Sequence, residues 1–401
     1  MNASQGRKPW GVAGLLLVLA GFVGGLAWLN APSQPGAVPA PPVEAPAGAA
    51  ASTPVPATGI LPPARQEPPA PAPFTQAPGA APVPEMRFQL PTKNDALFRD
   101  QPDQFFMFVD RYTPTGQVQV WEGGNYGFVR NQRQTAQGTV YTKFHEGIDI
   151  LPAERDEKGE PLDKVEVIAD GVVGYVTSGP RTSNYGNYVV VLHQVGKAGV
   201  FYSLYAHLRS IAAVVGTPLT RGSLIGQLGY TGDGIDRRRA HVHLEIGLIL
   251  SERFDDFYGA ALNGRGNFHG TNLAGMNAAG FLKENHLNPL LMPDHFLQNQ
   301  EIYYKVQVPN QGHELDLVAR YPWLRKPGAA DACWEIGFTG PGVPVSVAPG
   351  NKPVTSPTVS WVNPFPGSHS WNTRSLLGGS GNAAVLTREG VRFLKLVAGD
   401  F

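Results

Sequence analysis

From about residue 86 onward, hydrophobic and polar residues alternate in short runs that are separated by turn-forming residues. Runs of this length, rich in β-branched and aromatic residues, are typical of β-strands. The turns include Asp170-Gly171 and the segment 184–187, which carry the Gly and Asn residues that tight turns favour. We therefore expect a mainly β domain built on an antiparallel sheet with few helices. The predicted strands cover residues 117–121, 164–169, 171–176, 187–192, 201–204 and 242–248.

The C-terminal part of the chain continues this pattern after an interruption. Residues 251–288 form a loop-rich stretch, and from residue 302 a second series of β-like runs continues to residue 401. These runs are IYYKVQV, WEIGF, PVSVAP, TVSWV and VRFLKLVAG. We predict a first domain over residues 86–295 and a second, β-rich domain over residues 296–401.

The N-terminus has a different pattern, an almost uninterrupted apolar run over residues 10–29 that follows Arg7 and Lys8. A helix of about 20 residues spans roughly 30 Å, the hydrocarbon thickness of a bilayer. Positive charge before the run predicts a cytoplasmic N-terminus and an exported remainder. Residues 1–30 are therefore predicted to be a cytoplasmic stub and a single transmembrane helix in the cytoplasmic membrane. The alternative is a cleaved signal peptide, which would make the protein secreted.

Residues 31–85 consist largely of proline and alanine with very few charges. Such a composition cannot bury a hydrophobic core, so we predict a disordered, extended linker. It would tether the globular part to the membrane, or serve only as a passive spacer.

Composition narrows the function classes. Lysine plus arginine equals aspartate plus glutamate at 32 each, so the charge balance gives no reason to expect a nucleic-acid partner. The only cysteine is Cys333, which rules out an intrachain disulfide and a cysteine-based zinc finger. Gly (48) and Pro (37) are abundant, whereas charged residues make up only 16%, a composition that favours a turn-rich β protein.

The first candidate site is the segment His241-Val242-His243. On a strand, residues two apart point to the same face, so both imidazoles project to one side. Val242 and Leu244 would then face a core on the other side. Paired imidazoles on a strand indicate either a metal site or joint action on one substrate.

The second candidate is the segment 145–149, HEGID, which begins like a zincin motif but has Asp149 where that motif needs a histidine. In a straight strand, residues four apart lie about 13 Å from each other, so His145 and Asp149 can share an ion only if the chain bends near Gly147. A carboxylate and two imidazoles would leave one coordination position open, as in catalytic zinc sites. Otherwise Asp149 is a turn residue and His145 a surface residue.

A third histidine, His207, lies in the segment YAHL at the end of a predicted strand. Together, HxGxD, YAHL and HxH resemble the LytM or lysostaphin-type family of zinc endopeptidases. The framework segments 167–173, 185–189 and 221–232 also fit its pattern, and the resemblance covers roughly residues 120–250. It implies an antiparallel lysostaphin-type peptidase domain.

The resemblance also implies a site and a substrate. His145, Asp149 and His243 would bind one Zn²⁺ per chain, while His207 and His241 would lie beside the metal and assist the reaction. The substrate would be the stem peptides of bacterial peptidoglycan, whose crosslinks would be hydrolysed on the extracytoplasmic side of the membrane. In a thin-walled bacterium, the bond cut would join D-alanine to a diamino acid.

The chain departs from the family before its HxH motif, where Arg239-Ala240 replaces the usual Gly-Pro. The preceding loop, residues 236–239, is strongly basic. These arginines could recognise carboxylates of acidic stem peptides, or form only a solvated loop. Glu245 shares a face with His243 and is assigned a framework role, with support of a ligand as the alternative.

Two non-enzymatic functions compete with the endopeptidase. Some members of the family have lost zinc ligands and activate other wall hydrolases, but this chain retains all the polar residues of the set. A cell-wall-binding scaffold is the other alternative. The region 296–401 could bind wall, bind a regulatory protein or cap the active site.

Overall fold

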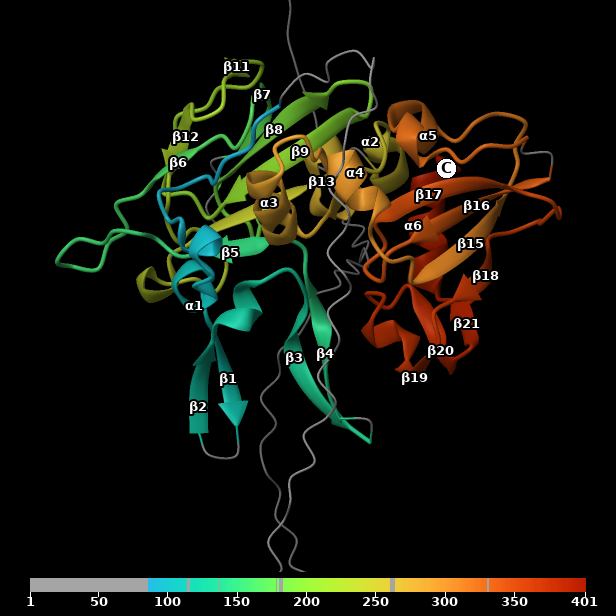
Figure 1. The fold of residues 1–401 in the computed structure, drawn as a ribbon, viewed down its shortest axis with the longest axis horizontal. Helices are drawn as coiled ribbons and strands as arrows, with labels where there is room; N and C mark the ends of the chain where they lie inside the picture. The colour runs from blue at the N-terminus through green and yellow to red at the C-terminus, as the bar shows by residue number, and fades with distance from the viewer. Residues whose placement is uncertain are drawn as a thin grey trace, which may run out of the picture. The chain divides into compact units, whose positions relative to one another are not determined.

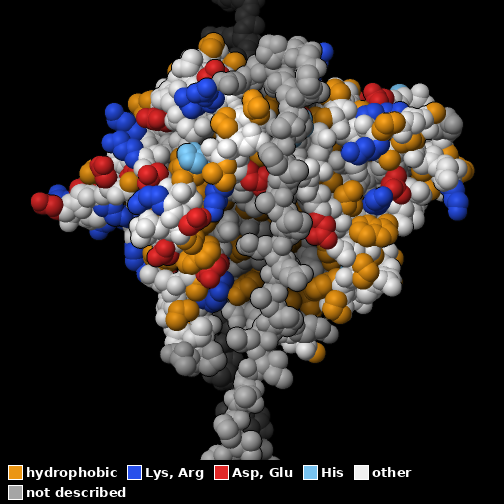
Figure 2. All heavy atoms as spheres, in the orientation of Figure 1, with side chains coloured by type: hydrophobic (Ala, Val, Ile, Leu, Met, Phe, Trp, Pro, Cys, Tyr) orange, Lys and Arg blue, Asp and Glu red, His pale blue; other side chains and the backbone are white. Residues whose placement is uncertain are grey.

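The computed structural model describes residues 86–401 except 114–115, 137, 178, 180–182, 260–263 and 330–331. The described chain is mainly β, as the alternating pattern predicts. The predicted anchor and linker lie outside the described residues. Within the described residues, no helix combines the length and hydrophobicity needed to cross a membrane. Acidic and basic side chains lie intermixed on the face shown in Figure 2.

An antiparallel sheet forms the centre of the first region (Figure 1). Its strand order is β11-β7-β8-β9-β13-β14, and β5 pairs with β13 on the edge opposite β9, which β14 also occupies. The bounds are β5 Ile148–Ile150, β7 Gly171–Thr177, β8 Tyr188–Val195, β9 Gly199–Ala206, β11 Pro218–Leu219, β13 Val242–Ile249 and β14 Leu273–Gly275.

A smaller sheet and two hairpins accompany the main sheet. The smaller sheet has the order β10-β12-β6, and the hairpins β1–β2 and β3–β4 extend from the main sheet (Figure 1). The bounds are β1 Val109–Thr113, β2 Gly116–Val120, β3 Gly127–Thr135, β4 Gly138–His145, β6 Lys164–Glu166, β10 Ser210–Ile211 and β12 Leu224–Gln227. Strand β3 contains a bulge between Phe128 and Arg130, which changes the direction of side chains near the end of the hairpin.

Both faces of the main sheet are buried, but they contact different groups. Along β8, Val189 and Val191 belong to the large hydrophobic core, while Tyr188 and Val190 belong to a smaller cluster on the other face. The same alternation along β9 and β13 sends every second residue to each face. The central strands are therefore rigid supports for any polar side chain that they carry.

The segment 251–288 contains more regular structure than predicted. It holds α2 (Phe254–Tyr258), β14 and α3 (Ala278–Leu287). Helix α3 begins after Asn277, whose side chain accepts a hydrogen bond from the Gly280 amide at 3.0 Å. This cap satisfies an amide that the first helical turn leaves unpaired, and the prediction overlooked it. Other short helices are α1 (Pro102–Phe105), α4 (Pro293–Gln298) and α5 (Asp316–Arg320).

The C-terminal region contains the sheets β17-β16-β15-β18 and β19-β20-β21. Their bounds are β15 Tyr304–Pro309, β16 Cys333–Phe338, β17 Pro344–Gly350, β18 Thr358–Val362, β19 Phe365–Ser368, β20 Leu377–Gly381 and β21 Ala383–Leu386. The last predicted strand is wrong, because VRFLKLVAG belongs to helix α6 (Arg388–Ala398). Thr387 caps this helix at its start, Gly399 ends it in a left-handed conformation, and Gly390, Leu394 and Val397 are buried at helical spacing.

Candidate metal centre

The structure brings His145, Asp149 and His243 together from three neighbouring segments. His145 ends β4, and Asp149 lies in β5 directly opposite His243 of β13. Between His145 and Asp149 the chain bends at Gly147, where a side chain would meet the Leu244 carbonyl oxygen at 2.4 Å. Only glycine fits this close approach, and the bend brings the two ligating groups together.

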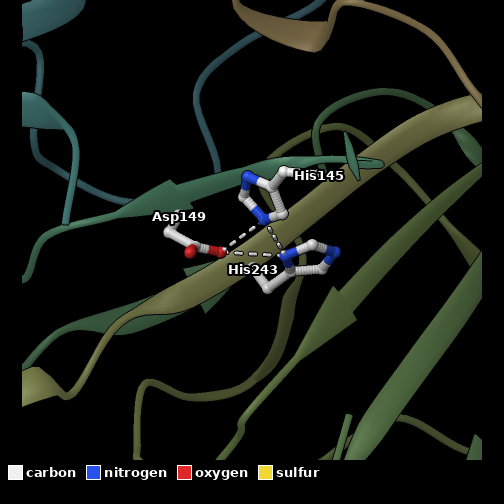
Figure 3. Close-up of side chains that lie close together, drawn as sticks. All are labelled: His145, Asp149 and His243. Carbon is white, nitrogen blue, oxygen red and sulfur yellow. Dashed lines mark hydrogen bonds and ion pairs between the residues drawn. The ribbon is translucent and has the colours of Figure 1, made fainter. Parts of the chain in front are cut away.

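The three side chains point their ligating atoms at one small region (Figure 3). His145 Nε2 lies 3.1 Å from Asp149 Oδ1, and His243 Nδ1 lies 2.9 Å from the same oxygen. The two imidazole nitrogens are 3.1 Å apart. A tetrahedral zinc site with bonds of about 2.0–2.1 Å holds its ligand atoms about 3.3 Å apart, so the arrangement fits this metal.

Hydrogen bonds on the far side of each imidazole favour the tautomers that a metal needs. His145 Nδ1 lies 2.8 Å from the Asn125 carbonyl oxygen, to which it can only donate. His243 Nε2 lies 3.0 Å from Glu245 Oε1. Each neutral ring therefore keeps its lone pair on the nitrogen that faces the centre, as in metal sites where a carboxylate or carbonyl orients the ligand.

Glu245 is part of this centre and does more than the framework role assigned to it. The Tyr185 hydroxyl donates to its Oε1 at 2.5 Å, and the Tyr202 hydroxyl donates to its Oε2 at 2.7 Å. Burial raises the pKa of Glu245, but the hydrogen bonds from His243 and both tyrosines outweigh it and lower the pKa overall. The carboxylate is therefore held ionised against His243.

His243 experiences the opposite effect. Burial lowers its pKa, but hydrogen bonds to Asp149 and Glu245 outweigh burial and raise the pKa of His243 to about 10. A cation at the centre would replace the proton that His243 Nδ1 otherwise retains. By contrast, burial lowers the pKa of His145.

Arg130 holds the second oxygen of Asp149, a contact that the sequence did not suggest. Its Nη2 lies 2.5 Å from Asp149 Oδ2, and its Nε donates to the Gly123 carbonyl oxygen at 2.8 Å. Burial raises the pKa of Asp149, but His145, His241 and Arg130 outweigh it and hold the pKa well below its usual range. The bulge beside Arg130 in β3 is the local feature that aims it at the carboxylate.

His207 and His241 lie beside the three converging residues. The ring centroid of His207 lies 4.7 Å from that of His241 and 5.9 Å from that of His243. His207 Nδ1 lies 2.8 Å from the Thr231 carbonyl oxygen, and His241 Nδ1 lies 2.6 Å from that of Arg239. Burial is the main cause that holds the pKa of His207 well below its usual value. His207 also has φ of 63°, a left-handed conformation that is uncommon for histidine.

These polar groups are almost completely buried. His145, Asp149, His207, His241 and His243 are between 2% and 7% exposed. Two carboxylates, Asp149 and Glu245, thus lie in a low-dielectric environment, where Arg130 contacts Asp149 and two tyrosine hydroxyls contact Glu245. Burying such charges is costly without compensation, and a divalent cation would supply it.

His193 and two arginines of the basic loop lie away from the candidate metal centre. His193 is buried on the opposite face of the sheet, where its nitrogens contact the Asp170 carbonyl oxygen and the Ser203 hydroxyl, both at 2.7 Å. Arg237 and Arg238 form exposed ion pairs with Glu160 and Asp110 respectively. Arg239 lies closer to the centre, because it is two residues from His241.

Several known proteins resemble part of this chain. No curated protein matches the chain. The catalytic domain of lysostaphin from Staphylococcus simulans is 17% identical, covering 48% of this chain and 98% of that one with a TM-score of 0.26. A variant catalytic domain of the prophage-encoded M23 protein EnpA from Enterococcus faecalis is 22% identical, covering 35% of this chain and 80% of that one with a TM-score of 0.22.

A zinc-containing peptidase from Vibrio cholerae is 21% identical, with 35% of this chain and 43% of that protein covered and a TM-score of 0.20. The profile of peptidase family M23 matches residues 143–253, a segment that contains His145, Asp149, His207, His241 and His243. Residues 143–253 therefore resemble peptidase family M23, which confirms the predicted resemblance to the LytM and lysostaphin-type family.

Proposed function

We propose that the protein is a zinc endopeptidase that hydrolyses peptide crosslinks of bacterial peptidoglycan. The observation that carries the proposal is the convergence of His145, Asp149 and His243 within 4.8 Å inside the M23 segment. The resemblance to LytM and lysostaphin-type peptidases supplies the substrate class. Membrane attachment through residues 10–29 and exposure to the extracytoplasmic side belong to the same proposal.

His145, Asp149 and His243 would hold the zinc ion, and the hydrogen bonds to Asn125 and Glu245 would keep both imidazoles in the ligating tautomer. Zinc held by these three residues would supply an activated water, because a bound zinc ion lowers the pKa of its water toward 7. Arg130 would fix the rotation of the Asp149 carboxylate.

His207 and His241 would move the protons. The Nδ1–H of His207 donates to Thr231, so Nε2 carries the lone pair, and the lowered pKa keeps the ring neutral. His207 therefore suits the role of proton acceptor. His241 has Nδ1 at the Arg239 carbonyl and Nε2 3.4 Å from Asp149 Oδ1. We assign it to the developing negative charge or the leaving amine.

The test measures zinc content and wall hydrolysis with the full chain purified in mild detergent. We expect about one zinc per chain and release of soluble fragments from purified peptidoglycan. His243→Ala should lose both, whereas His313→Ala, which removes an exposed histidine outside the site, should lose neither.

The outcomes separate the endopeptidase from its rivals. Zinc without fragment release, even on small crosslinked peptides, would reject the endopeptidase. Absence of both zinc and hydrolysis would favour the non-catalytic activator or the wall-binding scaffold. The fragments released by an active protein would identify the bond that is cut.

A further inference from the structure

A cleft of 470 Å³ lies between the hairpins β1–β2 and β3–β4. Its lining carries four cations, Arg111, Arg130, Lys143 and Arg239, and one carboxylate, Asp110. We call this cleft the cationic groove. The excess of positive side chains contrasts with the balanced charge of the whole chain.

Two of these cations face each other across the β3–β4 hairpin. Arg130 and Lys143 are directly opposite in the strand register. Like charges at such positions destabilise a sheet unless an anion compensates them. Arg130 is compensated by Asp149. Among the described residues, exposed Lys143 forms no ion pair with a carboxylate.

The groove's own carboxylate, Asp110, forms its ion pair with an arginine outside the groove lining. Asp110 Oδ2 lies 3.0 Å from Nη2 of Arg238, which holds it from outside the groove lining. Arg239 has no ion pair with a described carboxylate, and its Nε is buried without a hydrogen-bond partner. Arg239 therefore lines the groove without an ion pair, and a bound carboxylate would supply one to its guanidinium.

Arg111 helps to shape the groove. Its Nη2 donates to the Val129 carbonyl oxygen at 3.2 Å, and its guanidinium lies over the Tyr141 ring at 4.6 Å. These contacts connect the two hairpins and hold a cation at the groove wall. Arg111 is therefore held in a defined position, and it contributes a fixed positive charge to the groove.

The groove reaches the candidate metal centre at two points. Arg130 lines the groove and contacts Asp149. Arg239 also lines it, and the Arg239 carbonyl oxygen contacts His241 Nδ1 at 2.6 Å. A peptide bound in the groove would consequently extend to the candidate metal centre.

We propose that the cationic groove binds a carboxylate of the peptide substrate through Lys143 and Arg239, and so selects acidic peptides over their amidated forms. This inference rests on the proposed endopeptidase function and names a specificity determinant of its substrate. Carboxylate recognition by a guanidinium and an ammonium together uses charge-assisted hydrogen bonds, which are stronger than neutral ones.

The test uses a synthetic uncrosslinked stem tetrapeptide, which has no crosslink to hydrolyse, with its carboxylates either free or converted to carboxamides. Binding to the full chain is measured by calorimetry. We expect the acidic form to bind at least about tenfold more tightly, and the ratio to fall in high salt. Lys143→Met with Arg239→Met should bring the ratio close to one. Arg237→Met, which removes one positive charge outside the groove lining, should preserve the ratio.

Equal binding of both forms to the unmodified chain would overturn the groove proposal, as would a preference that survives in the double variant. Hydrolysis of crosslinked acidic and amidated dimers is measured in parallel. Hydrolysis without a preference would reject only the groove, whereas a preference without hydrolysis would reject only the endopeptidase. If the double variant loses its folded circular-dichroism spectrum, Lys143→Gln alone, at an exposed position, decides by whether the ratio drops.

Discussion

The two faces of the main sheet each bury histidine, but they treat it differently. On one face, His193 contacts a backbone carbonyl and the Ser203 hydroxyl, so both nitrogens have neutral partners. On the other face, His145 Nε2 and His243 Nδ1 point at each other and at Asp149. Burial alone therefore does not distinguish a structural histidine from a candidate metal ligand.

What distinguishes the faces is how charge and lone pairs are compensated. The His193 network is complete without any added group, because the Ser203 hydroxyl also contacts the Tyr205 hydroxyl at 2.9 Å. The centre around His243 has two ionised carboxylates and converging acceptors, and a cation completes it. Substitutions on either face should therefore change different measured quantities.

The largest difference is expected from His243→Ala compared with His193→Gln. Removing His243 deletes one of three ligands, so bound zinc should fall from about one per chain to near none and hydrolysis should be lost. His193→Gln should keep zinc at the normal ratio, because its contacts lie on the other face. Metal analysis by mass spectrometry and a wall-hydrolysis assay measure both. Retention of zinc by His243→Ala would contradict the assigned ligand set.

The second prediction concerns the pH dependence of stability. Burial lowers the pKa of His193 to about 4, despite the opposing hydrogen bond to the Asp170 carbonyl. Since an unfolded histidine has a pKa of about 6.5, the unfolded chain binds more protons between these values. The stabilising contribution is complete above pH 6.5 and is lost as the pH falls toward 4. It amounts to about 3 kcal/mol.

Urea unfolding at several pH values tests this prediction. The advantage of the unmodified protein over His193→Gln in free energy of unfolding should shrink by about 3 kcal/mol from pH 7 to pH 4. Both proteins are compared at the same zinc concentration, so effects of the metal cancel in the difference. A pH-independent difference would show that His193 does not remain neutral in the folded state.

The third prediction concerns Glu245, which orients His243. Glu245→Gln keeps an acceptor for His243 Nε2–H but removes the negative charge. Zinc affinity should fall by about ten- to a hundredfold, as for other groups that orient a ligand. Competition with a chelator measures it. Glu314→Gln, which changes an exposed carboxylate, serves as the control. Unchanged affinity in Glu245→Gln would return Glu245 to a framework role.

The sequence predicted features that depend on local spacing. Alternation along 242–248 indicated a strand and placed its histidines on one face, and Gly147 marked the bend before Asp149. It did not predict Arg130 or Asn125, because their contacts arise from a bulge and a loop that no short-range pattern encodes. Helix α6 was missed since its signal depends on the caps Thr387 and Gly399 as well as on its apolar run.

The smallest expected effects come from two adjacent residues of β9 that point to opposite faces. Tyr202→Phe removes a hydrogen bond to Glu245, and Ser203→Ala removes one to His193. Each should lower the free energy of unfolding by about 1–3 kcal/mol, because a buried partner loses its hydrogen bond. Only Tyr202→Phe should also weaken zinc binding, by less than about tenfold, since Glu245 retains Tyr185. Because the two positions are neighbours on one strand, a zinc effect from Ser203→Ala would mean that strand distortion reaches both faces, and the separation of structural and metal-binding histidines would fail.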